Sequence, residues 1–130
     1  MIVHDEGAVP LDAEGGTGMS MHRLYSGEDG ESHMEELDLA DHPELSQLQA
    51  AAGILFKSYP PDYFSDFHNA PRRQYVINVA GEVEIELGDG SVHRFGPGHV
   101  MLAEDLTGRG HITRVVGGKP RISAQIPLAD

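Results

Sequence analysis

The chain of 130 residues contains no cysteine. This absence excludes disulfide bonds and thiolate metal ligands, and it fits a reducing compartment. No run of 18 apolar residues occurs, so the sequence predicts no membrane-spanning helix. The first residues, M-I-V-H-D-E-G, lack the basic and apolar regions of a signal peptide. We therefore expect a cytoplasmic protein.

Basic residues are scarce, with 9 Lys and Arg against 21 Asp and Glu and a formal net charge of −12 at pH 7. Residues 1–66 contain 14 acidic and 2 basic side chains, whereas residues 67–130 contain seven of each. Because an acidic chain repels phosphate backbones, we expect no nucleic-acid partner. The acidic half is interpreted as a solvated surface.

The sequence also lacks several catalytic motifs and any internal repeat. The sequence has no serine in a nucleophile elbow, no phosphate-binding loop and no internal repeat. Its length predicts one domain that is large enough to bury a core. We expect an irregular N-terminal arm over residues 1–18 and a single domain over residues 19–130.

Strand signals are strongest in the second half of the chain. Residues 74–79, Q-Y-V-I-N-V, are β-branched and aromatic. Residues 82–87 alternate Glu with an apolar residue, which predicts a half-buried strand with an acidic outer face. G-D-G at 88–90 and G-P-G at 96–98 predict tight turns. Further strands are expected over residues 19–25, 32–39, 53–59, 91–95, 100–103, 111–116 and 121–126, with a short helical turn starting at 42 or 43.

Many short strands at this spacing predict an all-β sandwich or closed barrel. The sequence G-E-V-E-I-E-L, followed by D-G and F-G-P-G-H-V-M-L, also resembles the central part of the cupin family. The resemblance implies a small RmlC-like cupin: a jelly-roll barrel, or double-stranded β-helix, with its core over residues 66–116. Exposed sheet edges and the N-terminal arm favour a homodimer, which many cupins form.

The cupin resemblance also implies a metal site. When the first cupin motif, G-x5-H-x-H-x3,4-E-x6-G, is placed on Gly81, its glutamate falls on Gln74 and its two histidines fall on His68 and Ala70. The histidine of the second motif is best met by His111. The resemblance therefore implies a divalent transition metal, Fe, Mn, Ni or Zn, at His68, Gln74 and His111, with no ligand at Ala70.

Two functions follow from this resemblance. The first is a metal-dependent enzyme of the dioxygenase, isomerase or lyase type, acting on a small polar organic molecule in the barrel. Glu104 or water would move protons, Arg73 would orient an anionic group, and Tyr75 would contact the ligand. The alternative is a metal-free module that binds or senses a small ligand, and a third possibility is a structural protein with a vestigial pocket.

The polar loop 104–110 leaves two interpretations open for the carboxylates that precede His111. Glu104 or Asp105 could orient His111, complete a metal shell or act as a general base. The preferred interpretation is a turn capped by Asp105. For Arg73 the alternative to ligand binding is an ion pair with the acidic face of residues 82–87. No role is assigned to His4, His22, His42, His93 and His99.

Overall fold

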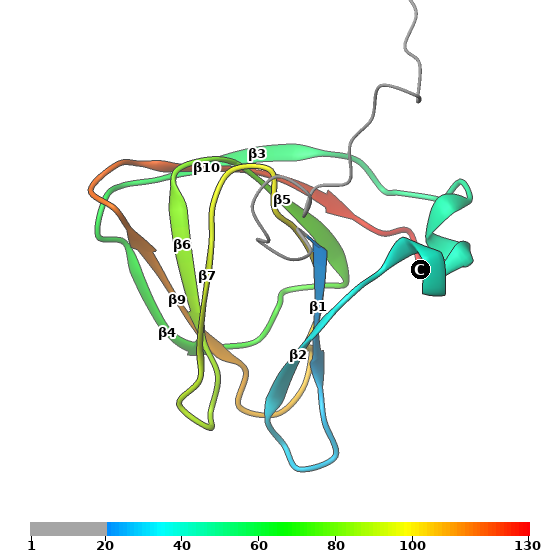
Figure 1. Ribbon diagram of the computed structural model, residues 1–130, viewed down its shortest axis with the longest axis horizontal. Coiled ribbons are helices and arrows are strands. Elements are labelled where there is room, and N and C mark those ends of the chain that lie inside the picture. Colours follow the sequence, from blue (N-terminus) through cyan, green and yellow to red (C-terminus); the bar gives the residue numbers. More distant parts are fainter. Residues whose placement is uncertain (1–20) are drawn as a thin grey trace, which may run out of the picture.

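A computed structural model of the chain describes residues 21–130, and the predicted arm over 1–18 lies outside the described residues. The described chain consists of ten β-strands and two 3-10 helices, η3 (Leu39–Asp41) and η4 (Pro43–Ser46) (Figure 1). The strands are β1 (Met21–Ser26), β2 (Ser32–Glu36), β3 (Leu55–Tyr59), β4 (Phe64–His68), β5 (Gln74–Ala80), β6 (Glu82–Glu86), β7 (Val92–Phe95), β8 (Val100–Glu104), β9 (His111–Val116) and β10 (Arg121–Pro127).

Strands β3 to β10 form a jelly roll. One sheet contains the order β8-β5-β10-β3 and the other has the order β4-β9-β6-β7, so the chain alternates between two facing sheets in the pattern of that fold. Figure 1 shows β4, β6, β7 and β9 on one side and β5 with β1 on the other. The predicted all-β jelly-roll barrel is therefore confirmed. Strands β1 and β2 extend the first sheet beyond β8, with β1 parallel to β8.

The alternating segment at 82–87 behaves as predicted. Val83, Ile85 and Leu87 are buried in the core between the sheets. The intervening glutamates face outward, as the period of two in a strand requires. Burial of a side chain such as Leu87 stabilises the fold by about 1.5–3 kcal/mol, so this face fixes the register of β6 in the barrel.

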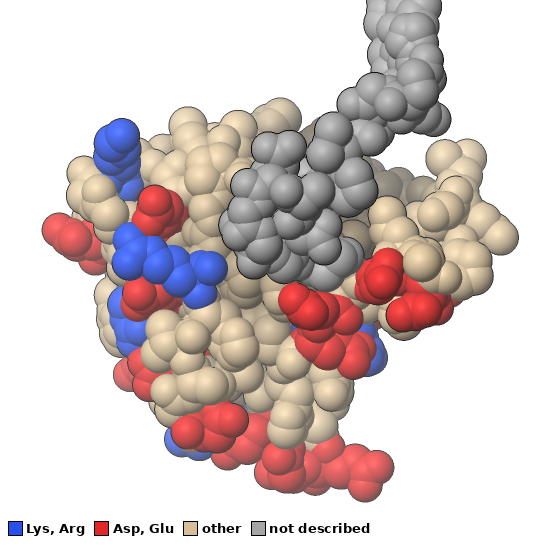
Figure 2. Space-filling model, in the orientation of Figure 1, with Lys and Arg blue, Asp and Glu red and all other residues tan. Residues whose placement is uncertain are grey.

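The acidic outer face of β6 is neutralised by arginines from its two neighbouring strands. Arg94 on β7 pairs with Glu82 and Glu84, and Arg114 on β9 pairs with Glu84 and Glu86. Figure 2 shows this mixture of basic and acidic side chains on the side of β6 and β7, while acidic side chains predominate at the end of the β1–β2 hairpin. Such surface pairs contribute little to stability individually, and they limit repulsion along the face.

The segment after β2 differs from the prediction. The expected strand over 32–39 ends at Glu36, because the Asp38 side chain accepts a hydrogen bond from the Ala40 backbone N–H and begins η3. The expected helical turn is η4, which begins at Pro43 in the first position, where a missing N–H matters least. No helix of the described residues has the length and apolarity to cross a membrane.

The outer face of the larger sheet carries exposed apolar side chains. Phe56 on β3, Val79 on β5 and Ile122 on β10 are 68%, 50% and 38% exposed. Their neighbours along each strand face the barrel interior instead. The homodimer predicted from the sequence stays a prediction.

Candidate functional site

The barrel encloses a cavity of about 260 Å³ between the two sheets. Its polar lining includes His68, Gln74, Asn78, His99, His111 and Arg121. The cavity lies where the cupin resemblance places a site, and all three residues predicted as metal ligands line it. Ala70, at the position that lacks a ligand, also lines it and is 7% exposed.

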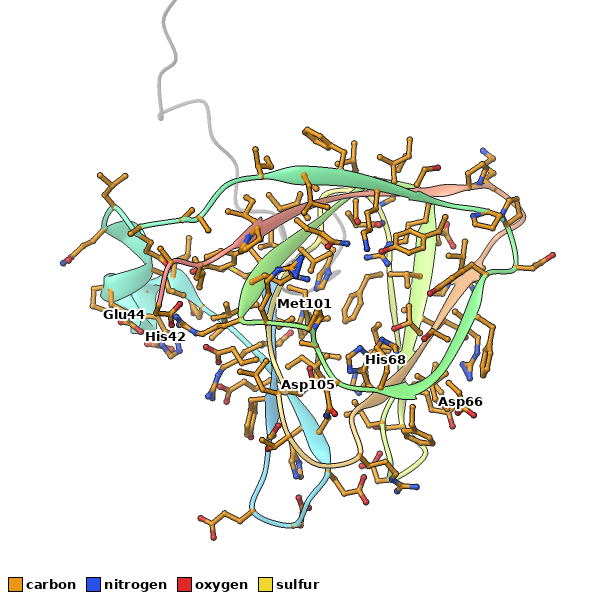
Figure 3. The ribbon with its side chains drawn as sticks, turned by 180° about the vertical axis from the view of Figure 1, so that it is seen from behind. His42, Glu44, Asp66, His68, Met101 and Asp105 are labelled. Atoms are coloured by element: carbon orange, nitrogen blue, oxygen red, sulfur yellow. The ribbon has the colours of Figure 1, made fainter. Side chains whose placement is uncertain are left out.

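His68 reaches the cavity because β4 is irregular. The pairing of β4 with β9 shifts register between Ser65 and His68, so both of these side chains line the cavity although they are three residues apart. Figure 3 shows His68 pointing into the barrel, as Met101 does, whereas Asp66 points away. The His68 Nδ1 atom lies 2.7 Å from the Asp66 carbonyl oxygen and donates to it. This bond places the proton on Nδ1 and leaves Nε2 as a free acceptor.

His111 is held by a buried carboxylate. Its Nδ1 atom donates to Oδ2 of Asp105 at 2.5 Å, and the Ser32 hydroxyl donates to the same oxygen at 2.7 Å. Asp105 is fully buried, and Oδ1 has no partner among the described residues. The preferred interpretation of Asp105 as the cap of a turn is therefore wrong. The carboxylate fixes the tautomer of His111 and leaves Nε2 available at the cavity wall.

A glycine brings the two histidines together. His68 and His111 are paired across β4 and β9, and their ring centroids are 4.5 Å apart. Gly110 precedes His111 at φ +82°, and a Cβ atom at this position would overlap the His68 carbonyl group. Only glycine adopts this backbone conformation without strain and also permits the close approach of the two strands.

Gln74, the third predicted ligand, has an amide oxygen with no hydrogen-bond partner among the described residues. It is 4% exposed at the start of β5, and Oε1 is buried without a partner among the described residues. Its side chain nevertheless lines the cavity. The site therefore combines two oriented imidazoles with an unused amide oxygen.

His99 lines the cavity but was not singled out in the sequence. It is 6% exposed and stacks on Phe95. Its Nε2 atom lies 3.0 Å from the Nδ1 atom of His22. Burial lowers the pKa of the His99 imidazole to about 3, and the neighbouring His22 and Arg121 add to the effect, so the ring is neutral at pH 7. His99 lies two residues before Met101, and side chains two residues apart in an extended strand share a face, so the sequence could have placed His99 on the inner face.

Arg121 was also missed. It is 8% exposed at the start of β10, lines the cavity and donates from Nε to Oδ1 of Asn78 at 2.8 Å. Burial lowers the pKa of the guanidinium from its usual value, although arginine remains charged at pH 7. In β10 the polar residues Arg121, Ser123 and Gln125 are buried, and Ile122 between them is exposed. The alternation of polar and apolar residues in β10 was visible in the sequence. The structure shows that the polar residues, and not the apolar ones, face the barrel interior.

The remaining predicted site residues do not reach the cavity. Glu104 pairs with Arg23 at 2.5 Å and also with Arg73, and Arg73 pairs with Asp130 at 2.7 Å. The alternative that Arg73 pairs with the acidic face of β6 is therefore wrong. These side chains lie outside the barrel because Met101 and Ala103 face inward on β8, so that Glu104 faces outward.

Tyr75 is displaced from the cavity for the same reason. Gln74 faces inward, so Tyr75 faces outward, where its hydroxyl donates to Oε1 of Gln49 at 2.6 Å. The structure thus brings together His68, Gln74 and His111. It leaves Arg73, Tyr75 and Glu104 on the opposite face of the sheet.

Comparison with family models and with curated proteins finds no match. Among solved structures, the chain is similar to an uncharacterised protein with a double-stranded β-helix domain from Klebsiella pneumoniae, at 19% identity, with 61% of this chain and 73% of that chain covered and a TM-score of 0.45. It is also similar to an RmlC-like cupin protein from Desulfovibrio desulfuricans, at 15% identity, 98% and 97% coverage and a TM-score of 0.41.

A further similar structure is a dTDP-4-dehydrorhamnose 3,5-epimerase from Bacillus anthracis, at 11% identity, 85% and 71% coverage and a TM-score of 0.44. Similarities at this level give no information about activity. The fold assignment rests on the strand order of the chain itself. By that order, the protein is a small jelly-roll barrel.

Proposed function

We propose that this protein binds a small polar organic molecule in the barrel cavity. The observation that carries the proposal is Gln74, whose buried Oε1 atom has no partner among the described residues. A buried polar atom without a hydrogen bond destabilises a fold by about 1–3 kcal/mol. Buried polar groups in native structures are nearly always paired, so a ligand that donates to Oε1 would explain the exception.

The two histidines support a reactive role for the same cavity. His111 is oriented by Asp105 through Nδ1, so Nε2 can accept a proton from a bound molecule or return one to it. The Asp105 carboxylate would stabilise the imidazolium that forms. His68 lies beside it with its own Nδ1 atom held. This arrangement suits isomerase or lyase chemistry, in which a proton is moved between two positions of a small molecule.

The substitution Gln74→Leu tests the binding site. We expect this variant to raise the free energy of unfolding of the ligand-free protein by about 1 kcal/mol, because an unpaired buried amide is replaced by an apolar group of similar size. We also expect a panel of succinate, succinamide, glycerol phosphate, glycerol and glucose to contain at least one compound that raises the Tm of the wild type. That shift should be lost in Gln74→Leu.

Two outcomes would contradict the proposal. One is a panel in which no compound shifts the wild-type Tm or the NMR signals of His68 and His111. The other is a loss of stability in ligand-free Gln74→Leu, which would give the amide a structural role. Gln49→Leu is the matched control, because Gln49 lies outside the cavity, where it accepts a hydrogen bond from Tyr75.

A divalent metal ion in the cavity is the second candidate. Histidine ligands of metals usually donate their other ring nitrogen to a carboxylate or carbonyl, and both His68 and His111 do so through Nδ1. The Nε2 atoms and the Gln74 amide oxygen would hold the ion, and these donor types fit Fe, Mn, Ni or Zn. Within residues 21–130, no cluster of three or more His, Cys, Asp or Glu side chains is arranged to hold a metal, so any site depends on the weaker amide donor.

Metal content distinguishes the two candidates. For tag-free protein soaked in Fe²⁺, Mn²⁺, Ni²⁺ or Zn²⁺ and then dialysed, the second candidate predicts nearly one ion per chain by elemental mass spectrometry. His68→Ala should reduce that content at least tenfold, because it removes one of three donors, while His42→Ala on the surface should not. Equal metal content in the wild type and His68→Ala would exclude the site, and an empty wild type would leave metal-free binding as the function.

A further inference from the structure

The cavity wall carries a positive charge that has no acidic counterpart in the described part of its lining. The Arg121 side chain is in no ion pair among the described residues, and it donates a hydrogen bond to the neutral amide oxygen of Asn78. Charged groups that are this deeply buried are normally paired, because removing a charge from water is strongly unfavourable. An arginine held in this way requires an explanation beyond packing.

The composition of the cavity contrasts with that of the chain. The protein has a net charge of −12, yet no Asp or Glu is among the described residues that line the cavity. Lys57 lines it together with Arg121, so both charged lining groups are basic. The lining histidine His99 is neutral at pH 7, because burial lowers its pKa to about 3. The charged groups of the described lining are thus basic within an acidic protein, and they attract anions of a size that can enter.

The hydrogen bonds around Arg121 leave its donors available. Nε is used by Asn78, which fixes the plane of the guanidinium, and the two terminal nitrogens have no partner among the described residues. Tyr59 lies beside it, with the guanidinium carbon 5.4 Å from the ring centroid. The Tyr59 hydroxyl accepts a hydrogen bond from Nε2 of Gln125 at 3.1 Å, so its own proton is free to be donated. A forked guanidinium next to a hydroxyl donor matches the geometry of carboxylate and phosphate groups.

We propose that Arg121 binds an anionic group, a carboxylate or a phosphate, of a small organic molecule in the barrel, with Tyr59 as a second donor. This inference rests on the proposed binding function and specifies the chemical class of its ligand. It also relocates the anion contact from Arg73, which lies outside the barrel, to the opposite face of the same sheet. The neutral end of the ligand would then lie toward Gln74, His68 and His111.

Matched acid and neutral compounds test the charge requirement in the wild-type protein. Succinate is compared with succinamide, and glycerol phosphate with glycerol, by NMR titration at low and high salt. We expect at least one acid of the two pairs to bind at least tenfold more tightly than its neutral partner and to bind less tightly at high salt. The pair that shows the larger ratio indicates whether the natural group is a carboxylate or a phosphate.

Variants of Arg121 test the residue itself. Arg121→Gln should weaken binding of the preferred acid at least tenfold, and Arg121→Lys should restore part of the affinity because it keeps the charge and loses the fork. The ligand-free Tm of Arg121→Gln should be unchanged or raised, since an unpaired buried charge has been removed. Arg94→Gln on the outer face of β7 is the control that should leave binding unchanged.

The results separate this inference from the proposed function. Equal binding of acids and neutral partners, or unchanged acid binding in Arg121→Gln, would overturn the anion site while leaving a binding cavity in place. A lower ligand-free Tm in Arg121→Gln with unchanged acid binding would assign the arginine a structural role. If none of these compounds binds to the wild type, both the inference and the proposed function fail.

Discussion

Gly110→Ala is expected to lower the free energy of unfolding by about 4 kcal/mol or more, a loss that places it among the most damaging single substitutions. Gly110 has φ +82°, and an added Cβ atom would overlap the carbonyl group of His68. The obstructing atoms belong to the backbone of β4, so no side chain can rotate out of the way. Strands β4 and β9 would have to separate, and His68 and His111 would move apart with them.

Gly90→Ala is the matched control for this change. Gly90 also has positive φ, at +88°, but no atom lies within 4 Å of the position of an added Cβ. Its substitution should therefore carry only the backbone penalty, about 1–2 kcal/mol. Chemical denaturation of both variants measures the difference. Similar losses for the two would show that the close approach of β4 and β9 does not depend on Gly110.

Asp105→Ala is expected to lower the free energy of unfolding by about 3 kcal/mol. The change leaves the Ser32 hydroxyl and the His111 Nδ1–H group buried without their acceptor, and each such group destabilises the fold by about 1–3 kcal/mol. For a domain of this size we expect the Tm to fall by more than about 10 °C. Nitrogen NMR of His111 should also change from a single tautomer, protonated at Nδ1, to a mixture.

Asp105→Asn separates the hydrogen bonds from the charge. The amide oxygen can still accept from both donors, so the variant should retain most of the stability and the tautomer, while the ability to stabilise a protonated His111 is lost. Asp66→Ala, an acidic residue that points away from the barrel, serves as the control (Figure 3). A stability of Asp105→Ala equal to that of the wild type would show that the buried pair does not organise this end of the barrel.

The sequence predicted local structure correctly where the apolar residues of a strand are also the ones that face the core. In residues 82–87 the apolar positions are also the buried ones, so both the strand and its inner face were predicted correctly. Turns at 88–90 and 96–98 followed from glycines that adopt positive φ, at 88° for Gly90 and 92° for Gly98. The cupin resemblance placed His68, Gln74 and His111 together, and all three line one cavity.

The same reasoning failed where a polar face is the inner one. In β10 the alternation predicts a strand but does not say that Arg121 faces the cavity and Ile122 faces outward. Glu104 and Asp105 are adjacent in the chain, yet Glu104 forms ion pairs outside the barrel and Asp105 is buried against His111. A change of one position reverses the face in a strand, so sequence proximity to a site residue is a poor guide to contact.

By itself, the sequence determined the strands, the turns and the presence of histidines near the centre of a barrel, because these depend on period, backbone preference and local composition. Only the tertiary structure decided which face of each strand lines the cavity, because that depends on the sheet opposite. It also decided that Asp105 turns inward to orient His111 and that no described carboxylate pairs with Arg121, since both facts depend on how the strands fold around the cavity. The charge of the cavity, which is opposite to that of the whole protein, arises from this selection of inner faces.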